Sequence, residues 1–395
     1  MHTFRTGRRG DVPVSKRLLR VVACFALVLT LRPQPAAAAG GNPAPPAPPT
    51  TYRIPSGALT VTNSSGLIKA LQGTTPRDIV LKSGNYSNST FFNNVYGHRI
   101  YSATLGGAVL RAGLAIGGNS GTGNGLVQGV TFDVTEPART LQNSIVHVWG
   151  TGTGTRILDS TFSGHSSVGA GIMVRQPEGA VIQRVRVRDF TDYGVLVDAN
   201  VQGLVVVTPS LLEDIDVANV SRAVPRSSNG TAEACVWVGN TVTLRRALLR
   251  SCAWEGLWTG TANTGSLHED LDIDSANVGV YLEHYTTGST FQRMRIGPNT
   301  GRGVNCEWAD PAWGGLPASV DNVIQDSTIY SHNAGVNMDQ GTTRTIVRRV
   351  KFVGQIWAAI SDYLGNANEY YDNDYTEIGA GAVPVSYDHY PFGDV

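Results

Sequence analysis

Three aromatic residues and three acidic residues occupy equivalent places in a short segment that recurs along the chain. The aromatic residues are Trp237, Trp258 and Tyr281, and the acidic residues are Glu283, Glu307 and Asp339. A pair of carboxyl groups can cleave a glycosidic bond when one donates a proton and the other acts as a nucleophile or base. Flat aromatic side chains suit the apolar faces of sugar rings. These six residues can act together only if the fold places their segments side by side.

The recurring segment has two halves, and each alternates apolar and polar residues. The first half is exemplified by LEDIDV at Leu212, and the second, which starts with a small residue, by GVYLEH at Gly279. Alternation with a period of two indicates β-strands, and the glycine-rich polar clusters between them indicate turns. A unit of about 23–25 residues that repeats in this way is typical of a solenoid, in which each turn stacks on the previous one.

The start of the repeat region carries a second signal. The segment SSGLIKALQG, from Ser64, predicts a short helix with a serine cap that covers the first turn, and DIVLKSGNY follows from Asp78 as a strand. With the two-strand repeats, these features resemble the right-handed parallel β-helix proteins of the pectin-lyase-like superfamily, over roughly residues 55–378. The resemblance implies an all-β solenoid of roughly 11–12 turns with an N-terminal capping helix.

The same resemblance says less about the reaction. The superfamily includes polysaccharide lyases, glycosidases, pectin esterases and uronate epimerases, with phage spikes and adhesins beside them. Polygalacturonase-like sites contain an adjacent Asp-Asp pair as well as a later Arg-x-Lys, and this sequence has no adjacent Asp-Asp pair. No residue role is therefore carried over from the superfamily, and the candidate site depends on this chain's own columns of residues.

In a parallel β-helix, equivalent residues of successive turns stack about 4.8 Å apart. In the second half of the unit, the residues two and four places after the small one are expected to point outward. The first outward column then contains Met173, Leu196, Trp237, Trp258, Tyr281, Asn305 and Asn337. The second contains Arg175, Asp198, Gly239, Gly260, Glu283, Glu307 and Asp339. The two glycines are expected to leave a gap beside the aromatic residues, and His147 joins the first column if IVHVWG is an earlier copy of the strand.

These columns predict a secreted enzyme that cleaves glycosidic bonds of a polysaccharide, preferably by hydrolysis. Glu283 and Glu307 would be the acid and its partner, and Asp339 a base or a sugar ligand. Repulsion between neighbouring carboxylates favours retention of a proton on one of them. Substrate contacts are expected from Trp237, Trp258, Tyr281, Asp198, His284, Asn305 and His147. Neighbouring turns are about 4.8 Å apart, so both retaining and inverting geometries remain open. Hydrolysis of this kind requires no metal.

Two other functions fit the same residues. A lyase that acts by β-elimination on a uronic-acid polymer would hold Ca²⁺ with Asp198, Glu283, Glu307 and Asp339. Arg302 or Arg175 would then be the base. Alternatively, a non-catalytic surface protein would bind carbohydrate along this face without reaction. The aromatic column can also be ladder packing beneath a covering loop, and the acidic column a solvated ladder.

Residues 1–39 predict a secretory signal peptide, because a basic start precedes an apolar run from Val21 to Leu31 and small residues before Gly40. The run is too short to cross a membrane as a helix. Residues 40–54 are expected to be a Pro-rich linker, and residues 55–395 the β-helix domain. An extracellular location follows from this organisation.

Removal of the signal segment, with seven basic residues and one acidic residue, leaves 31 − 7 = 24 basic and 31 − 1 = 30 acidic residues, a net charge of −6. An acidic chain is a poor partner for nucleic acid or an anionic membrane, so a polysaccharide is the expected partner; the oligomeric state stays open.

Export permits a disulfide, for which Cys235 and Cys252 are the better pair. Cys306 is expected to be a buried thiol, and the long turns at 221–233 and 308–320 to wall a groove.

Overall fold

The protein is described by a computed structural model that covers residues 51–117, 125–149, 154–175, 179–198, 208–220, 233–239, 241–260, 263–275, 277–307, 318–388 and 391. The predicted signal peptide and most of the predicted linker lie outside these residues. Most of the two long turns, at 221–233 and 308–320, also lie outside them. Among the described residues, no helix is both long enough and apolar enough to cross a membrane.

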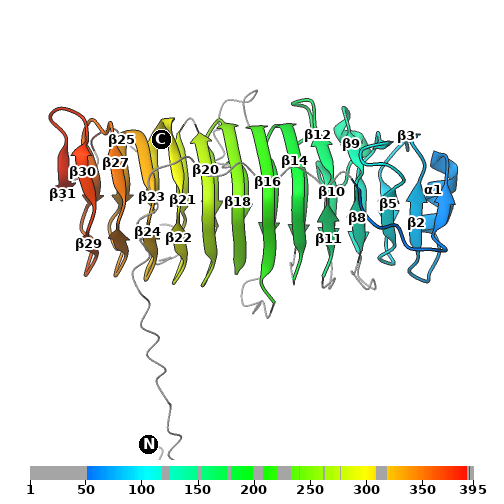
Figure 1. Ribbon diagram of the computed structural model, residues 1–395, viewed down its shortest axis with the longest axis horizontal. Coiled ribbons are helices and arrows are strands. Elements are labelled where there is room, and N and C mark those ends of the chain that lie inside the picture. The colour runs from blue at the N-terminus through cyan, green and yellow to red at the C-terminus, as the bar shows by residue number, and fades with distance from the viewer. Residues whose placement is uncertain are drawn as a thin grey trace, which may run out of the picture. The chain divides into compact units, whose positions relative to one another are not determined.

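The described chain winds into a coil whose strands stack in parallel, as Figure 1 shows from α1 at the blue end to β29–β31 at the red end. We call the strand ladder that carries the predicted columns the site sheet. It consists of β4 (Phe92–Asn94), β7 (Leu114–Gly117), β10 (Ser144–Trp149), β13 (Ala170–Arg175), β15 (Tyr193–Asp198), β17 (Ala234–Val238), β19 (Glu255–Thr259), β21 (Val278–Leu282), the C-terminal parts of β23 (Arg295–Cys306) and β25 (Thr328–Met338), β28 (Ala358–Asp362) and β31 (Val383–Ser386). One strand per turn agrees with the predicted solenoid.

Two further ladders complete each turn. The first consists of β1 (Leu59–Val61), β2 (Asp78–Leu81), β5 (Arg99–Ser102), β8 (Leu126–Gln128), β11 (Arg156–Leu158), β14 (Val181–Phe190), β16 (Ser210–Val220), β18 (Val242–Cys252), β20 (Leu267–Ser275), β22 (Thr290–Gln292), β24 (Val323–Gln325), β26 (Ile346–Arg348) and β29 (Glu369–Tyr371). The second consists of β3 (Gly84–Tyr86), β6 (Ala108–Leu110), β9 (Thr131–Asp133), β12 (Thr161–Ser163), the C-terminal parts of β14, β16, β18 and β20, the N-terminal parts of β23 and β25, β27 (Lys351–Val353) and β30 (Asp374–Glu377). The strands β14, β16, β18 and β20 therefore continue from one ladder into the other.

The interior of the coil is filled by stacked apolar side chains. The inward residues of the site sheet include Ile172, Val195, Val236, Leu257 and Val280, and each is fully buried. Stacking of this kind removes apolar surface from water on every turn, which is the main stabilising term for such a coil.

The cysteine predictions are confirmed. A disulfide joins Cys235 in β17 to Cys252 in β18. Cys306 is a free thiol with no exposed surface, and burial, with Asp339 and Asp362 nearby, raises its pKa. A buried thiol with a raised pKa is a poor nucleophile, because the thiolate is the reactive form.

The predicted capping helix is present as α1 (Ser64–Leu71), and it buries Leu67, Ala70 and Leu71. Its cap differs from the prediction. The residue at the N-cap is Asn63, whose side chain accepts a hydrogen bond from the backbone N–H of Gly66 at 2.8 Å. Asparagine and serine both supply a side-chain oxygen for this bond, so Asn63 and the serine that follows it were both suited to the N-cap position. The predicted serine cap is therefore wrong.

The last residues of the predicted linker pack on the outside of the coil. Tyr52 donates a hydrogen bond to the carbonyl of Ser102, and burial is the main cause that raises its pKa to about 12. Tyr52 and Ile54 pack against an outer cluster that contains Tyr101 and Leu158. The packed structure thus includes residues that the sequence assigned to the linker.

A column of alternating charge, which we call the ion ladder, follows the bend between the first and the second of these strand ladders. It consists of Asp159, Arg184, Asp214, Arg246, Asp270, Arg293, Asp326, Arg349 and Asp372. Every member has a positive φ, between 51° and 56°. Arg246 binds Asp214 through two N–H···O contacts of 2.6 and 3.1 Å, and Arg184, Arg293 and Arg349 bind the preceding aspartate in the same two-point way.

The ion ladder lets the chain bend at the same place on each turn. A positive φ is disfavoured for most side chains, although aspartate tolerates it better than arginine does. A two-point guanidinium–carboxylate contact is the strongest form of ion pair and fixes geometry as well as charge. We infer that these pairs offset the backbone strain of the bend and help to set the register between turns.

Candidate active site

The two predicted outward columns are formed. We call the first the aromatic column; in it, Leu196 pairs with Trp237, Trp237 with Trp258, Trp258 with Tyr281, Tyr281 with Asn305 and Asn305 with Asn337. The second, the acidic column, continues just past the strand ends through backbone hydrogen bonds. The N–H of Glu283 donates to Thr259, that of Glu307 to Leu282, and that of Asp339 to Cys306, at 3.0, 2.9 and 3.2 Å.

The six side chains on which the prediction depends are accessible to solvent. Each of Trp237, Trp258, Tyr281, Glu283, Glu307 and Asp339 is partly exposed. They therefore line one side of the coil and are not sealed in its core. The predicted register is confirmed, while the catalytic roles stay predictions.

The three aromatic rings pack edge to face. Trp237 and Trp258 have ring centroids 6.1 Å apart and planes at 84°, and Trp258 and Tyr281 have centroids 5.8 Å apart and planes at 76°. This arrangement is favourable for aromatic pairs, but it does not produce one continuous flat surface. A sugar ring can therefore stack on an individual ring, and the trio forms a stepped wall.

The gap expected at the two glycines is filled by an indole ring. A Cβ atom added at Gly260 would lie 2.1 Å from Cζ2 of Trp237, and one added at Gly239 would lie 3.2 Å from Cη2 of the same ring. The glycines thus accommodate Trp237, which lies across the acidic column. The prediction of an open gap is wrong, because a large side chain on the neighbouring column occupies the space.

Glu307 lies at the centre of the best-defined polar cluster. Its carboxylate accepts a hydrogen bond from the hydroxyl of Tyr281, and its Oε2 lies 3.5 Å from Nε2 of His284. Burial, followed by the charge of Glu307, raises the pKa of Tyr281 well above its usual value. Tyr281 is therefore a neutral hydrogen-bond donor, and its hydroxyl holds the Glu307 carboxylate in place.

The next turns continue as a buried polar network. Asn305, only 4% exposed, accepts hydrogen bonds from Arg302 at 3.0 Å and from the side chain of Asn337 at 2.8 Å. Asn337 also bonds Asp339 at 3.1 Å. Asn305 was predicted to contact substrate; here it links Arg302 to the acidic column, so its immediate role is to position its neighbours.

Two predicted substrate contacts lie apart from the carboxylates. Asp198 is three turns from Glu283 along the acidic column, about 14 Å at the spacing of stacked strands, and it pairs with Arg175 at 3.0 Å. His147 is 2% exposed and its Nδ1 lies 3.1 Å from the hydroxyl of Ser144. Burial, with Arg175 nearby, lowers the pKa of His147 to about 4. The structure does not bring either residue to the carboxylate pair.

The Asp198 position also bears on a calcium site. Four carboxylates that include Asp198 cannot surround one ion, because two glycine turns separate it from Glu283. Within the ranges that the structure describes, no group of three or more His, Cys, Asp or Glu side chains has an arrangement that could hold a metal ion. The four-carboxylate Ca²⁺ cluster predicted for a lyase is therefore not formed.

Sequence reasoning missed residues of the site sheet that lie at the position directly before the small residue of the repeat. Tyr193 and Glu255 belong to one column of the site sheet, and Glu233 directly precedes β17. The pKa of Tyr193 is raised by burial and then by Asp192, Glu233, Glu255 and Glu283, so these carboxylates lie within electrostatic reach of its hydroxyl. Reading the repeat from the residue before the small one, as in CAWEGLW, would have found Glu255.

Comparisons with known proteins bear on the fold. No protein-family profile matches the sequence, and no curated protein is similar to it. Among solved structures, the A-module of the mannuronan C-5 epimerase AlgE4 from Azotobacter vinelandii is similar, with a TM-score of 0.56 and 16% identity over 85% of this chain and 96% of that one. An alginate lyase of family PL6 in complex with a trisaccharide has a TM-score of 0.52 and 12% identity over 84% and 85% of the two chains.

A third similar structure is the Dettilon tailspike protein, with a TM-score of 0.53 and 12% identity over 81% of this chain and 64% of that one. At such identities the likeness concerns architecture, and it agrees with the stacked parallel strands. The chain therefore has the right-handed parallel β-helix fold.

Proposed function

We propose that this protein is a carbohydrate-active enzyme that cleaves glycosidic bonds in a polysaccharide by hydrolysis. The observation that carries the proposal is the partly exposed pair Glu283 and Glu307 on neighbouring turns, beside the aromatic residues Trp258 and Tyr281. Like charges on adjacent turns oppose folding, so their retention on an accessible face favours a chemical role. The solved structures that share the fold include enzymes whose names state action on polysaccharides, which is consistent with this class of substrate.

The surroundings of the two carboxyl groups suggest different roles. A hydrogen-bond donor stabilises the ionised form of a carboxylate, and Tyr281 supplies such a donor to Glu307. We assign Glu307 as the nucleophile or base and Glu283 as the group that protonates the leaving glycosidic oxygen. Asp339 would bind a sugar hydroxyl or assist a water molecule, and Trp237 and Trp258 would contact sugar rings on the preceding turns.

The alternative is β-elimination on a uronic-acid polymer. It is favoured by Arg302, a buried residue whose guanidinium donates a hydrogen bond to Asn305 in the aromatic column, because neutralisation of a uronate carboxylate makes the neighbouring C–H more acidic. Tyr281 and His284 would then be candidates to exchange protons with the substrate. Against this reading stand the net charge of −6 that would remain after removal of the predicted signal segment and the failure of the predicted four-carboxylate cluster to form.

The deciding experiment incubates the protein with neutral and acidic polysaccharides, with and without added Ca²⁺, and identifies the new chain ends. Hydrolysis gives new reducing ends without near-ultraviolet absorbance, whereas elimination gives an unsaturated, absorbing product. Glu283→Gln and Glu307→Gln are each expected to lower the rate by about 10²–10⁴-fold, the usual effect of losing a positioned acid or base. Glu136→Gln, which changes an exposed residue paired with Arg139, serves as the control.

Unchanged rates in both glutamine variants would remove the assigned roles. Binding of polymer with no new chain ends on any substrate would instead favour the non-catalytic carbohydrate-binding protein. An absorbing product that disappears with a chelator would establish the Ca²⁺-dependent lyase.

A further inference from the structure

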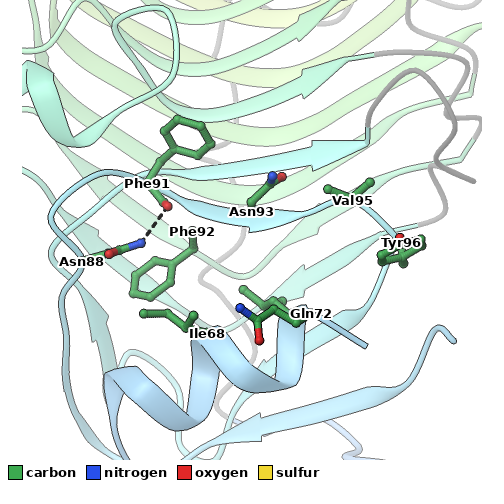
Figure 2. A pocket seen from close by; sticks show the side chains of 9 residues that line it. Ile68, Gln72, Asn88, Phe91, Phe92, Asn93, Val95 and Tyr96 are labelled. Atoms are coloured by element: carbon green, nitrogen blue, oxygen red, sulfur yellow. Dashed lines mark hydrogen bonds between the residues drawn. The ribbon is translucent and has the colours of Figure 1, made fainter. Parts of the chain in front are cut away.

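A cavity of about 370 Å³ lies at the N-terminal end of the coil, between α1 and β4. Figure 2 shows Ile68 of α1 and Gln72, which directly follows the helix, on one side of it and Asn93, Val95 and Tyr96, from β4 and the residues that follow, on the other. Within the described chain, β4 pairs with β7 on one side only. The cavity therefore occupies the place where one further turn would otherwise stack.

The lining of this cavity combines aromatic and amide side chains and contains no charged residue. It consists of Ile68, Leu71, Gln72, Asn88, Phe91, Phe92, Asn93, Val95 and Tyr96. Asn88 is held in its own turn, because its amide donates to the carbonyl of Phe91 at 2.8 Å and its oxygen accepts from Ser89. The volume falls within the range of small-molecule sites.

Three polar groups remain available to a ligand. Across the described residues, the side-chain amides of Gln72 and Asn93 and the hydroxyl of Tyr96 make no hydrogen bond to another protein group. An amide both donates and accepts, as sugar hydroxyl groups require, and the aromatic rings of Phe91 and Tyr96 offer apolar faces. This combination fits an uncharged, hydroxyl-rich ring better than an anion, which would find no cation in the lining.

The cavity belongs to the same sheet as the candidate active site. Asn93 pairs with Ala115, Ala115 with His147, and the column continues through Met173 and Leu196 to Trp237. Five strand spacings separate Asn93 from Trp237, which is about 24 Å along the coil. A polymer of several sugar units can span that length.

We propose that the cavity between α1 and β4 binds a neutral sugar unit and acts as a remote subsite for the polymer on which the candidate active site acts. The second part of this inference rests on the proposed function; the binding of a neutral sugar in the cavity does not. The remote subsite raises the affinity for long chains by tethering, since the second contact becomes intramolecular.

The first test measures binding of cellohexaose, xylohexaose, mannohexaose and laminarihexaose by calorimetry, with a galacturonate hexamer as the acidic comparison. The variants Gln72→Ala/Asn93→Ala and Asn93→Trp remove the polar contacts or fill the cavity. Gln72 and Asn93 are exposed, so both variants are expected to fold. At least one neutral hexaose is expected to bind, with an affinity at least 10-fold lower in both variants and no preference for the acidic hexamer.

The control is Glu307→Gln, which alters the candidate active site and should leave cavity binding unchanged. The proposal is overturned if no neutral hexaose binds, if the cavity variants bind as the unmodified protein does, or if only the acidic hexamer binds. On a cleaved polymer, the cavity variants should raise KM at least three-fold with kcat unchanged, while KM for a trisaccharide stays the same. Cavity-dependent binding without any cleavage would refute the proposed hydrolysis but not the sugar site.

Discussion

The ion ladder and the acidic column are built by the same repeat on different walls of the coil, yet their charges are arranged in opposite ways. In the ion ladder, acid and base alternate on consecutive turns, and each arginine binds the aspartate of the turn before it. In the acidic column, Glu283, Glu307 and Asp339 follow one another on three turns with no basic residue between them in the column.

The difference shows what each wall is for. Alternating charge at a spacing of about 4.8 Å is favourable on every turn, so the ion ladder stabilises the register of the coil. Consecutive carboxylates at the same spacing repel each other. The acidic column therefore weakens the fold, and under the proposed function its carboxyl groups on neighbouring turns act as the acid and as the nucleophile or base. Four predictions follow from this contrast, from the largest effect to the smallest.

Glu307→Gln should separate activity from stability. The rate on a cleaved polysaccharide is expected to fall about 10³-fold, equivalent to about 4 kcal/mol of transition-state stabilisation. The midpoint of thermal unfolding should stay the same or rise, because one like charge leaves the column. Rate assays and scanning calorimetry on the same preparation measure both. A large fall in the midpoint would mean that Glu307 stabilises the fold, and the acidic column would then not differ from the ion ladder in its effect on stability.

Asp214→Asn should lower stability and leave activity unchanged. It removes the charge that binds Arg246 while it keeps a residue that tolerates positive φ. Because the Asp214 side chain is 4% exposed and Arg246 is 32% exposed, we expect a loss of about 2 kcal/mol, below the usual cost of breaking a fully buried pair. Urea unfolding measures the loss, and the polysaccharide-cleaving rate should be unchanged.

Asp321→Asn is the matched control for this change. Asp321 and Arg344 also have positive φ and also make two contacts, at 2.5 and 2.7 Å, but both side chains are largely exposed. An exposed pair contributes little, so no measurable loss is expected. If both variants lose the same stability, burial is not what gives the ion ladder its effect.

His268→Phe tests whether the core beside the ion ladder, rather than the ladder itself, sets acid sensitivity. Burial lowers the pKa of His268 to about 3, and its ring stacks on Phe291. In the unfolded chain this histidine has its ordinary pKa of about 6.5, so below that pH the unfolded state binds more protons than the folded state. The free energy of unfolding therefore falls by about 2 kcal/mol between pH 7 and pH 5. The variant should remove this contribution, and the loss that remains in denaturant titrations at the two pH values should come from His147 and His98, whose pKa values burial also lowers.

Carboxylates beside the ion ladder respond in a lower pH window. Burial acts to raise the pKa of Glu213, but hydrogen bonds from Arg245 and Arg246 outweigh it and leave the pKa below its usual value. The stability from Glu213 is present above its unfolded pKa and is lost only as the pH falls through the lowered folded value. The control for His268→Phe is His332→Asn, which changes an exposed histidine and should leave the loss between pH 7 and pH 5 unaltered. A variant His268→Phe that loses as much stability between pH 7 and pH 5 as the unmodified protein would contradict the assignment.

Gly260→Ala should disturb the aromatic column through Trp237. Because the new methyl group would lie 2.1 Å from the indole, the ring must move, and overpacking of this kind costs at least about 1 kcal/mol. Gly239→Ala meets the same ring at 3.2 Å and should cost less. Near-ultraviolet circular dichroism reports the ring movement. Equal spectra for both variants and the unmodified protein would show that Trp237 does not depend on these glycines.

The sequence was a sufficient guide to backbone register. Alternation of apolar and polar residues decides which side chains face the core, so it correctly aligned Trp237 with Trp258 and Glu283 with Glu307. The same argument correctly buried Cys306. The sequence also contains the residues of the ion ladder, as the alternating Asp and Arg at the third position of LED, LRR, HED and FQR. A bend with positive φ at these positions is not expected from strand periodicity.

What the sequence left undetermined depends on side-chain torsions and on contacts between columns. Nothing in the spacing of Trp237 and Gly260 indicates that an indole crosses to the neighbouring column. The hydrogen bond from Tyr281 to Glu307, which assigns distinct roles to the carboxyl groups, likewise depends on torsions within one turn. Asp198 was grouped with the carboxylates because it shares their column, although distance along a solenoid grows with every turn.

The alternation of the ion ladder limits how such a chain can change length. Loss of a single turn would bring Asp214 next to Asp270, or Arg246 next to Arg293, and so place two like charges together at the junction. Loss or duplication of two turns restores opposite charges at the junction. We therefore expect this coil to tolerate the loss or duplication of an even number of turns better than that of an odd number.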